Sequence, residues 1–100
     1  MTIRKELNGS SLVYQLEGRL DTNTAPELEK ELKQDIVPIT DLVFDLKDLD
    51  YISSAGLRVL LATQKIMNRQ GKMTVRNPQE PIYEIFEVTG FTDILTIERD

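Results

Sequence analysis

The 100-residue chain contains no cysteine and no histidine. The absence of cysteine excludes disulfides, thiolate nucleophiles and zinc–thiolate sites. The absence of histidine removes the usual general base of catalysis and the commonest metal ligand. No Gly-x-Ser-x-Gly elbow and no Ser-x-x-Lys pair offers another nucleophile. We therefore expect a protein that is not an enzyme and that binds no cofactor and no metal ion.

The chain also lacks clustered positive charge and long apolar runs. Its 12 basic and 17 acidic residues give a net charge of −5, which opposes binding to nucleic acid or anionic lipid. No apolar run approaches the roughly 20 residues of a membrane span. The first residues, MTIRKELNG, lack the apolar core of a secretion signal. We expect one domain over residues 1–100, in the cytoplasm, with no direct nucleic-acid contact and no membrane insertion.

The order of secondary-structure signals predicts an α/β fold. Strand patterns at 2–7 and 12–20 flank Asn8-Gly9-Ser10, a strong hairpin signal. Further helices and strands are predicted, in order, near 25–36, 41–46, 55–70, 72–76, 81–89 and 94–97. The resulting order is β-β-α-β-α-β-α-β. It indicates a central, mixed, mostly parallel sheet of about five strands with helices packed on it.

Several local patterns make sharper predictions. Thr24 and Glu27 have the spacing of a capping box at a helix start. Gly71 stands after a helix, where a left-handed C-terminal cap is common. Within that helix we expect Ala62 and Ile66 to be buried beside the leucines. The apolar segment DLVFDL predicts a strand covered on both faces.

A short acidic loop is expected between this strand and the next helix. Asp45, Asp48 and Asp50 match no calcium-loop spacing, so we interpret them as solvated side chains. A single glycine at position 56 does not make a phosphate-binding nest, which gives nucleotide binding no support.

Two serines, Ser53 and Ser54, stand directly before the longest helical pattern. A serine at a helix start places its hydroxyl at the surface and can accept a hydrogen bond from the first turn. The helix N-terminus carries roughly half a positive charge, so a phosphate attached at Ser54 would be tolerated. A simple capping role is the commoner one for such serines. Spacing alone leaves both roles open.

Parallel strands bring the loops that follow them to the same edge of a sheet. The loop after residue 20 is therefore expected beside the two serines and the start of their helix. By elimination this edge is predicted to be a protein-binding surface, made of Asp21, Thr22, Asn23, Ser53, Ser54, Gly56, Leu57 and Arg58.

Three segments in this order resemble bacterial anti-sigma factor antagonists, which are STAS-domain proteins: Gly18-Arg19-Leu20-Asp21, then residues 45–57, then Val88-Thr89-Gly90-Phe91 with Ile94 and Leu95. The likeness covers nearly the whole chain and implies a single STAS-like domain. In that family the serine two residues before the glycine is phosphorylated, which falls on Ser54. The family aspartate implicated in partner contact falls on Asp21.

The resemblance implies a partner switch. The unmodified protein would bind an anti-sigma factor that is also a serine kinase, freeing a sigma factor. Phosphorylation would release it, and a metal-dependent serine phosphatase would restore it. Most members have aspartate directly before the acceptor, and many have serine or threonine directly after it, whereas this chain has Ser53 and Ala55. Ser53 removes a negative charge and adds a second candidate hydroxyl. The alternative is a STAS adaptor or scaffold module, never phosphorylated, in a signalling or membrane-associated assembly.

Overall fold

Five strands in the order β1-β2-β3-β4-β5 form one sheet, in which β1 and β2 are antiparallel and every other pair is parallel. The computed structural model describes residues 1–100, and the predicted order of elements is confirmed. The elements are β1 (Thr2–Asn8), β2 (Ser11–Leu20), α1 (Ala25–Asp35), β3 (Asp41–Ile52), α2 (Ser54–Gln70), β4 (Lys72–Arg76), α3 (Glu80–Thr89), the 3-10 turn η1 (Phe91–Asp93) and β5 (Ile97–Glu98).

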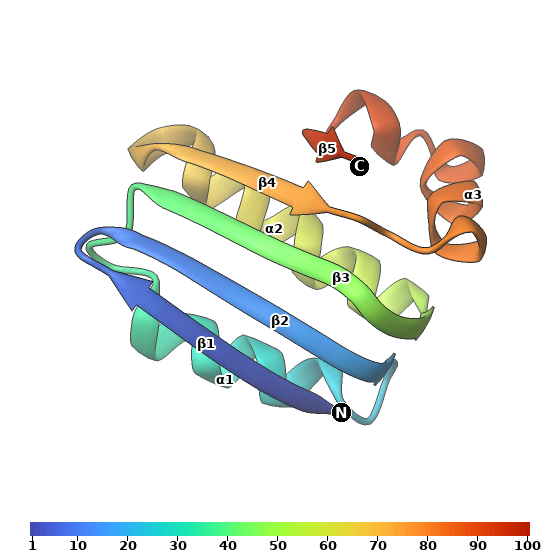
Figure 1. The fold of residues 1–100 in the computed structure, drawn as a ribbon, viewed down its shortest axis with the longest axis horizontal. Coiled ribbons are helices and arrows are strands. Elements are labelled where there is room, and N and C mark those ends of the chain that lie inside the picture. The colour runs from blue at the N-terminus through green and yellow to red at the C-terminus, as the bar shows by residue number, and fades with distance from the viewer.

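Helices α1 and α2 lie side by side on one face of the sheet, and α3 lies beyond the C-terminal end of β4 (Figure 1). The single core lies between the sheet and this helix layer. Alternate residues of the central strands supply it because side chains of a strand alternate between faces. Among the fully buried ones are Tyr14 and Phe44, whose rings stack 5.7 Å apart. None of the three helices combines the length and the apolar character that a bilayer crossing requires.

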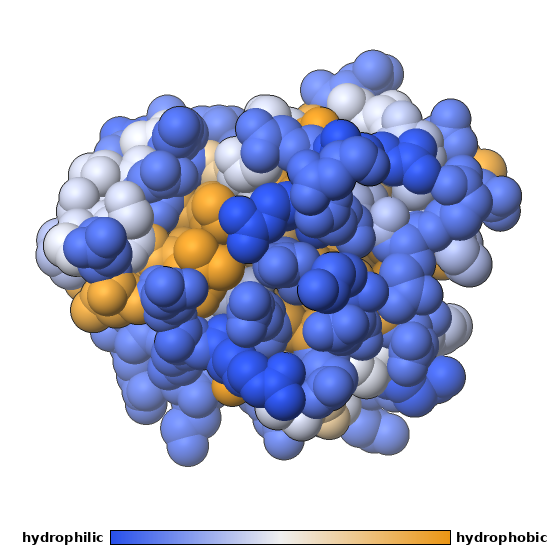
Figure 2. Space-filling view, in the orientation of Figure 1, coloured by the Kyte–Doolittle hydropathy of each residue, from blue (hydrophilic) through white to orange (hydrophobic).

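The other face of the sheet is open, so the prediction that β3 is covered on both sides is wrong. Val43 and Asp45 point to this face and are only partly buried, whereas Leu42, Phe44 and Leu46 point into the core. The open face is largely hydrophilic, with an apolar area toward the turn between β1 and β2 (Figure 2). Only one layer of helices therefore shields the sheet.

Strand β3 is longer than predicted and absorbs the expected acidic loop. It continues to Ile52 because β2 pairs with it along its whole length, as far as Leu20 opposite Ile52. Asp48 and Asp50 are exposed on the strand, and Leu49 between them is buried. The Arg19 guanidinium lies 4.1 Å from the ring centre of Tyr51 on the neighbouring strand. Asp48 and Asp50 are therefore solvated as expected, but on a strand, whereas Asp45 is partly buried and forms an ion pair with Arg76 at 3.2 Å.

Two of the predicted caps have a different structure. At the start of α1 no capping box forms, because the Thr24 hydroxyl instead accepts from the Asp21 N–H and donates to the Arg19 carbonyl, both at 2.8 Å. At the end of α2, Gly71 has an extended backbone with φ 170° and not a left-handed one. Glycine is required there because a Cβ would overlap the backbone of Thr40.

The C-terminal part has the predicted order of elements, and only its last strand is shifted. Gly90 ends α3 in the left-handed conformation, with φ 79°. Phe91 follows it and stacks on Phe86 with ring centres 6.4 Å apart. The last strand is shorter and later than predicted, because η1 occupies residues 91–93 and only Ile97 and Glu98 pair with β4.

Candidate functional site

The C-terminal ends of β2 and β3 lie at the same edge of the sheet because these strands are parallel. The Ser53 N–H donates to the Leu20 carbonyl at 2.9 Å and ties the end of β3 to the end of β2. This contact holds the loop of residues 21–24 beside the start of α2. Thr22 from the loop and Arg58 from α2 line one groove. The two segments that the sequence predicted to be neighbours are therefore adjacent.

Asp21 organises the loop before α1. Its Oδ1 accepts from the N–H groups of Asn23 at 3.0 Å and Thr24 at 3.1 Å, and its Oδ2 lies 3.6 Å from Nε of Arg19. Partial burial acts to raise the pKa of Asp21, but these hydrogen bonds and the arginine outweigh it and hold the pKa below its usual value. The carboxylate is therefore ionised at neutral pH and fixed in orientation. Thr22 and Asn23 beside it are exposed.

Ser53, and not Ser54, is the cap residue of α2. Its backbone is extended, with φ −101° and ψ 177°, and its carbonyl accepts the first helical hydrogen bond from Leu57 at 2.9 Å. The Ser53 hydroxyl makes no capping bond, and its buried Oγ has no hydrogen-bond partner. Because the Ser53 oxygen is buried, it is shielded from any molecule that approaches this edge of the sheet. A buried hydroxyl without a partner also lowers the stability of the fold.

Ser54 is the first helical residue of α2 and is exposed. The first N–H groups of a helix have no intrahelical partners, and the helix end carries roughly half a positive charge. No acidic residue lies in the first turn of α2 to oppose an added anion. A phosphate on the Ser54 oxygen would thus meet favourable electrostatics.

Gly56 and Leu57 are buried, so they do not present side chains at the surface. Gly56 allows α2 to approach the end of β2 closely, because an added Cβ would lie 2.8 Å from Cγ of Leu20 and 3.0 Å from its carbonyl oxygen. The glycine thus fixes where Ser54 stands. Arg58 is exposed and completes the predicted set.

We expect Gly56→Ala to lower the free energy of unfolding by about 1–2 kcal/mol. An added Cβ would contact backbone as well as side chains, so overpacking should cost about 2–3 kcal/mol, the upper part of its usual range, and the better helix propensity of alanine returns about 1 kcal/mol. Urea unfolding followed by circular dichroism measures the change. Ala62→Gly at an exposed site of α2 serves as the control for propensity alone. A Gly56→Ala protein as stable as the wild type would contradict the close approach.

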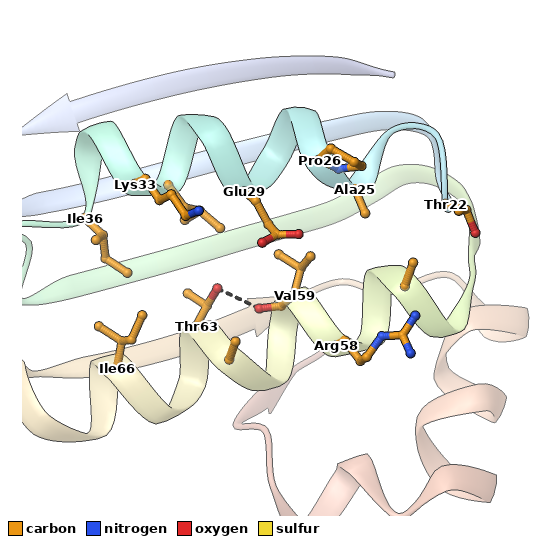
Figure 3. Close-up of a pocket in the computed structure, with 13 residues that line it drawn as sticks. Thr22, Ala25, Pro26, Glu29, Lys33, Ile36, Arg58, Val59, Thr63 and Ile66 are labelled. Carbon is orange, nitrogen blue, oxygen red and sulfur yellow. Dashed lines mark hydrogen bonds between the residues drawn. The ribbon is translucent and has the colours of Figure 1, made fainter.

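A groove of about 470 Å³ runs from this edge along the line between α1 and α2. Thr22 and Arg58 lie at the end of the groove next to this sheet edge, and Ile36 and Ile66 lie at its opposite end (Figure 3). The Thr63 hydroxyl in the groove wall already donates to the Val59 carbonyl at 2.7 Å, so its hydrogen is not free for a ligand. The surface of the groove is mainly apolar.

The groove was not predicted, because the helical pattern of α2 placed Ala62 and Ile66 in the core. Both are exposed, and 44% of Ile66 is accessible. Met67, for which no burial was predicted, is fully buried instead. The missed signal was that the apolar residues of α2 cover a face wider than one sheet can bury.

The edge carries hydroxyls, the fixed carboxylate of Asp21 and the guanidinium groups of Arg19 and Arg58. No group of three or more acidic side chains that could hold a metal ion is found in the structure. Groups of these kinds can form hydrogen bonds and ion pairs, and a serine hydroxyl can accept a phosphoryl group.

Comparisons with known proteins agree with this architecture. A curated relative, the anti-sigma-B factor antagonist of Bacillus subtilis (strain 168), is 32% identical over 91 residues, which cover 90% of this chain and 84% of the relative. The crystal structure of an anti-sigma factor antagonist from Mycobacterium paratuberculosis superposes with a TM-score of 0.86 at 23% identity, over 97% of this chain and 84% of that one.

The Bacillus cell fate determinant SpoIIAA in its phosphorylated form superposes with a TM-score of 0.77 at 17% identity, over 96% of this chain and 90% of that one. Both structural likenesses show a shared fold. The family model described as the STAS domain matches residues 2–100. The resemblance noted in the sequence is thereby confirmed, and the chain belongs to the STAS domain family.

Proposed function

We propose that this chain is an anti-sigma factor antagonist whose binding is switched by phosphorylation of Ser54. Membership of the STAS domain family and the relative named as an anti-sigma-B factor antagonist support the first part. The observation that carries the second part is the contrast between the two adjacent serines. Ser54 is exposed at the free N-terminus of α2, whereas the Ser53 oxygen is buried.

A kinase must bring the acceptor oxygen into line with the γ-phosphate of ATP. The Ser54 hydroxyl is accessible for this without any rearrangement of the fold. The Ser53 hydroxyl would first have to leave the interior, while backbone hydrogen bonds with Leu20 and Leu57 hold the residue in its place. Ser54 is therefore the acceptor in our proposal, although Ser53 stands where most relatives have aspartate.

The folded domain can carry the phosphate at low cost. A phosphoserine adds about −1.5 to −2 charges at neutral pH. At Ser54 this charge lies at the positive end of α2, and Arg58, four residues further on, is its neighbour on the helix surface. The modification therefore changes the surface that a partner meets and leaves the core unchanged.

The partner in this proposal is an anti-sigma factor with serine kinase activity. It binds the unmodified edge formed by the loop of residues 21–23, Ser54 and Arg58, while Gly56 and Leu57 act by positioning α2. A serine phosphatase removes the phosphate and restores binding. The chain acts in the cytoplasm, where sigma factors work, and it acts by binding and not by catalysis.

Incubation with the cognate kinase and ATP tests the acceptor. Intact-mass measurement should show one added phosphate on the wild type and on Ser53→Ala, and none on Ser54→Ala. Ser53→Ala is the matched control because it removes only a buried hydroxyl without a partner. Full modification of Ser54→Ala would refute the assignment. An unmodified wild type that still co-purifies in a kinase-free assembly would instead identify an adaptor or scaffold module.

A further inference from the structure

Strand β1 forms one edge of the sheet, and no strand lies on its outer side (Figure 1). Six of its seven residues are exposed. An edge strand presents a row of unpaired N–H and C=O groups that can pair with another chain. Such pairing is usually prevented by charges on the edge, so the sign and order of the charges on β1 decide whether a second strand fits.

The hairpin geometry fixes which backbone groups of β1 point outward. The turn has two central residues, Gly9 and Ser10, and Asn8 faces Ser11 across it. A two-residue turn is closed by a hydrogen-bonded pair, and such pairs alternate with non-bonded ones along an antiparallel ladder. The odd-numbered residues of β1 therefore direct their N–H and C=O groups away from β2.

The sequence TIRKELN is self-complementary when two copies run antiparallel about Lys5. In this register Arg4 of each copy lies opposite Glu6 of the other copy. Two such pairs therefore form on the open face of the sheet. It also joins the outward-facing backbone groups of both strands along all seven residues. If one strand slides along the other by two residues in either direction, Arg4 faces Arg4 of the second copy or Glu6 faces Glu6. Either like-charge pair is unfavourable. Charge thus selects one register.

The helix-side face of β1 offers apolar complementarity in the same register. Leu7 is 65% exposed, and the register sets it opposite Ile3 of the second copy. Ile3 and Met1 form the apolar part of a hollow of about 460 Å³, whose other side consists of polar residues of α1: Glu27, Lys30, Glu31 and Gln34. The Leu7 side chain of one copy can pack on Ile3 and Met1 of the other. The pairing therefore removes an exposed leucine from water on each copy.

Lys5 would face Lys5 of the second copy, but this charge is already balanced within each chain. Its Nζ lies 2.8 Å from Oε2 of Glu31 and 2.8 Å from Oδ2 of Asp35. These contacts draw the ammonium toward α1 and raise the pKa of Lys5. Each lysine thus brings two carboxylates with it, so the two ammonium groups repel each other weakly.

We propose that this protein self-associates into a two-fold symmetric dimer through antiparallel pairing of its β1 strands, in the register that sets Arg4 against Glu6 and Ile3 against Leu7. The two sheets join into one of ten strands. The Ser54 edge lies at the ends of β2 and β3 and not along β1, so it stays free in the dimer.

Sedimentation equilibrium of the intact chain over a concentration series tests the pairing. The wild type should dimerise reversibly. Arg4→Glu and Glu6→Arg should each weaken dimerisation about tenfold or more, because each sets two like-charge pairs across the two-fold axis. An equimolar mixture of the two variants should regain the association, since the charges of one variant then face opposite charges of the other. Circular dichroism checks that both exposed substitutions leave the fold intact.

Glu84→Arg on α3 is the matched control for Glu6→Arg, because it makes the same change in net charge at an exposed site away from β1 and should leave dimerisation nearly unchanged. Hydrogen exchange should also slow at the amides of Ile3, Lys5 and Leu7 as concentration rises. A wild type that is monomeric at millimolar concentration overturns the proposal. So does a mixture that associates no better than either variant alone, or association that neither variant weakens.

Discussion

Phosphorylation of Ser54 is expected to lower the affinity for the anti-sigma factor by more than about 100-fold. A phosphoserine carries about −1.5 to −2 charges, and burying an unpaired charge in an interface costs several kcal/mol. A loss of about 2.7 kcal/mol already corresponds to a factor of about 100 in the dissociation constant. Biolayer interferometry with the immobilised partner, using unmodified and fully phosphorylated protein, measures this ratio.

The thermal stability of the phosphorylated protein is the control for this prediction. An anion at a helix N-terminus stabilises by about 0.3–1 kcal/mol. Ser54 is exposed at that position, so Tm should stay the same or rise slightly. A phosphorylated domain that unfolds at markedly lower temperature would mean that binding is lost through unfolding and not through surface charge.

Gly71→Ala is expected to lower the free energy of unfolding by more than about 3 kcal/mol, which is beyond the usual range of about 0.5–3 kcal/mol for single substitutions. The new Cβ would overlap backbone atoms of Thr40, and backbone cannot move aside as a flexible side chain can. Relief of the overlap would break the hydrogen bond from the Lys72 N–H to the Thr40 carbonyl, 2.9 Å long, which starts the pairing of β4 with β3. Urea unfolding measures the loss.

Gly9→Ala separates this steric effect from the general cost of replacing a glycine. Gly9 has φ 64°, but a Cβ there would meet no atom within 4 Å. Its substitution should cost about 1–2 kcal/mol through backbone conformation alone. A Gly71→Ala protein that loses no more stability than Gly9→Ala would show that the contact with Thr40 is not tight.

Local patterns in the sequence predicted the fold because most of it depends on local periodicity and turns. The hairpin at Gly9, the helix starts near Ala25 and Ser54, and the left-handed cap at Gly90 are all set within a few residues. Gly71 was singled out for the wrong reason. Its requirement comes from Thr40, 31 positions earlier in the chain, and no local pattern reports such an approach.

The continuation of β3 through its acidic residues also depends on distant partners. Lys47, Asp48 and Asp50 disfavour a strand by propensity. Pairing with β2 as far as Ile52 overrides that preference. For the same reason local patterns alone could not choose between the two serines, and only the family resemblance favoured Ser54 over Ser53. Their difference in burial arises from the packing of α2 against the ends of β2 and β3, where Ser53 faces inward and Ser54 faces solvent.

In the proposed switch one exposed hydroxyl, on Ser54, controls partner binding. The decisive measurement is calorimetric titration of the purified anti-sigma factor with antagonist that has been treated with kinase and ATP. Treatment should abolish measurable binding of the wild type and of Ser53→Ala, while treated Ser54→Ala should bind as tightly as before treatment. Loss of binding by treated Ser54→Ala, or full binding by phosphorylated wild type, would contradict it.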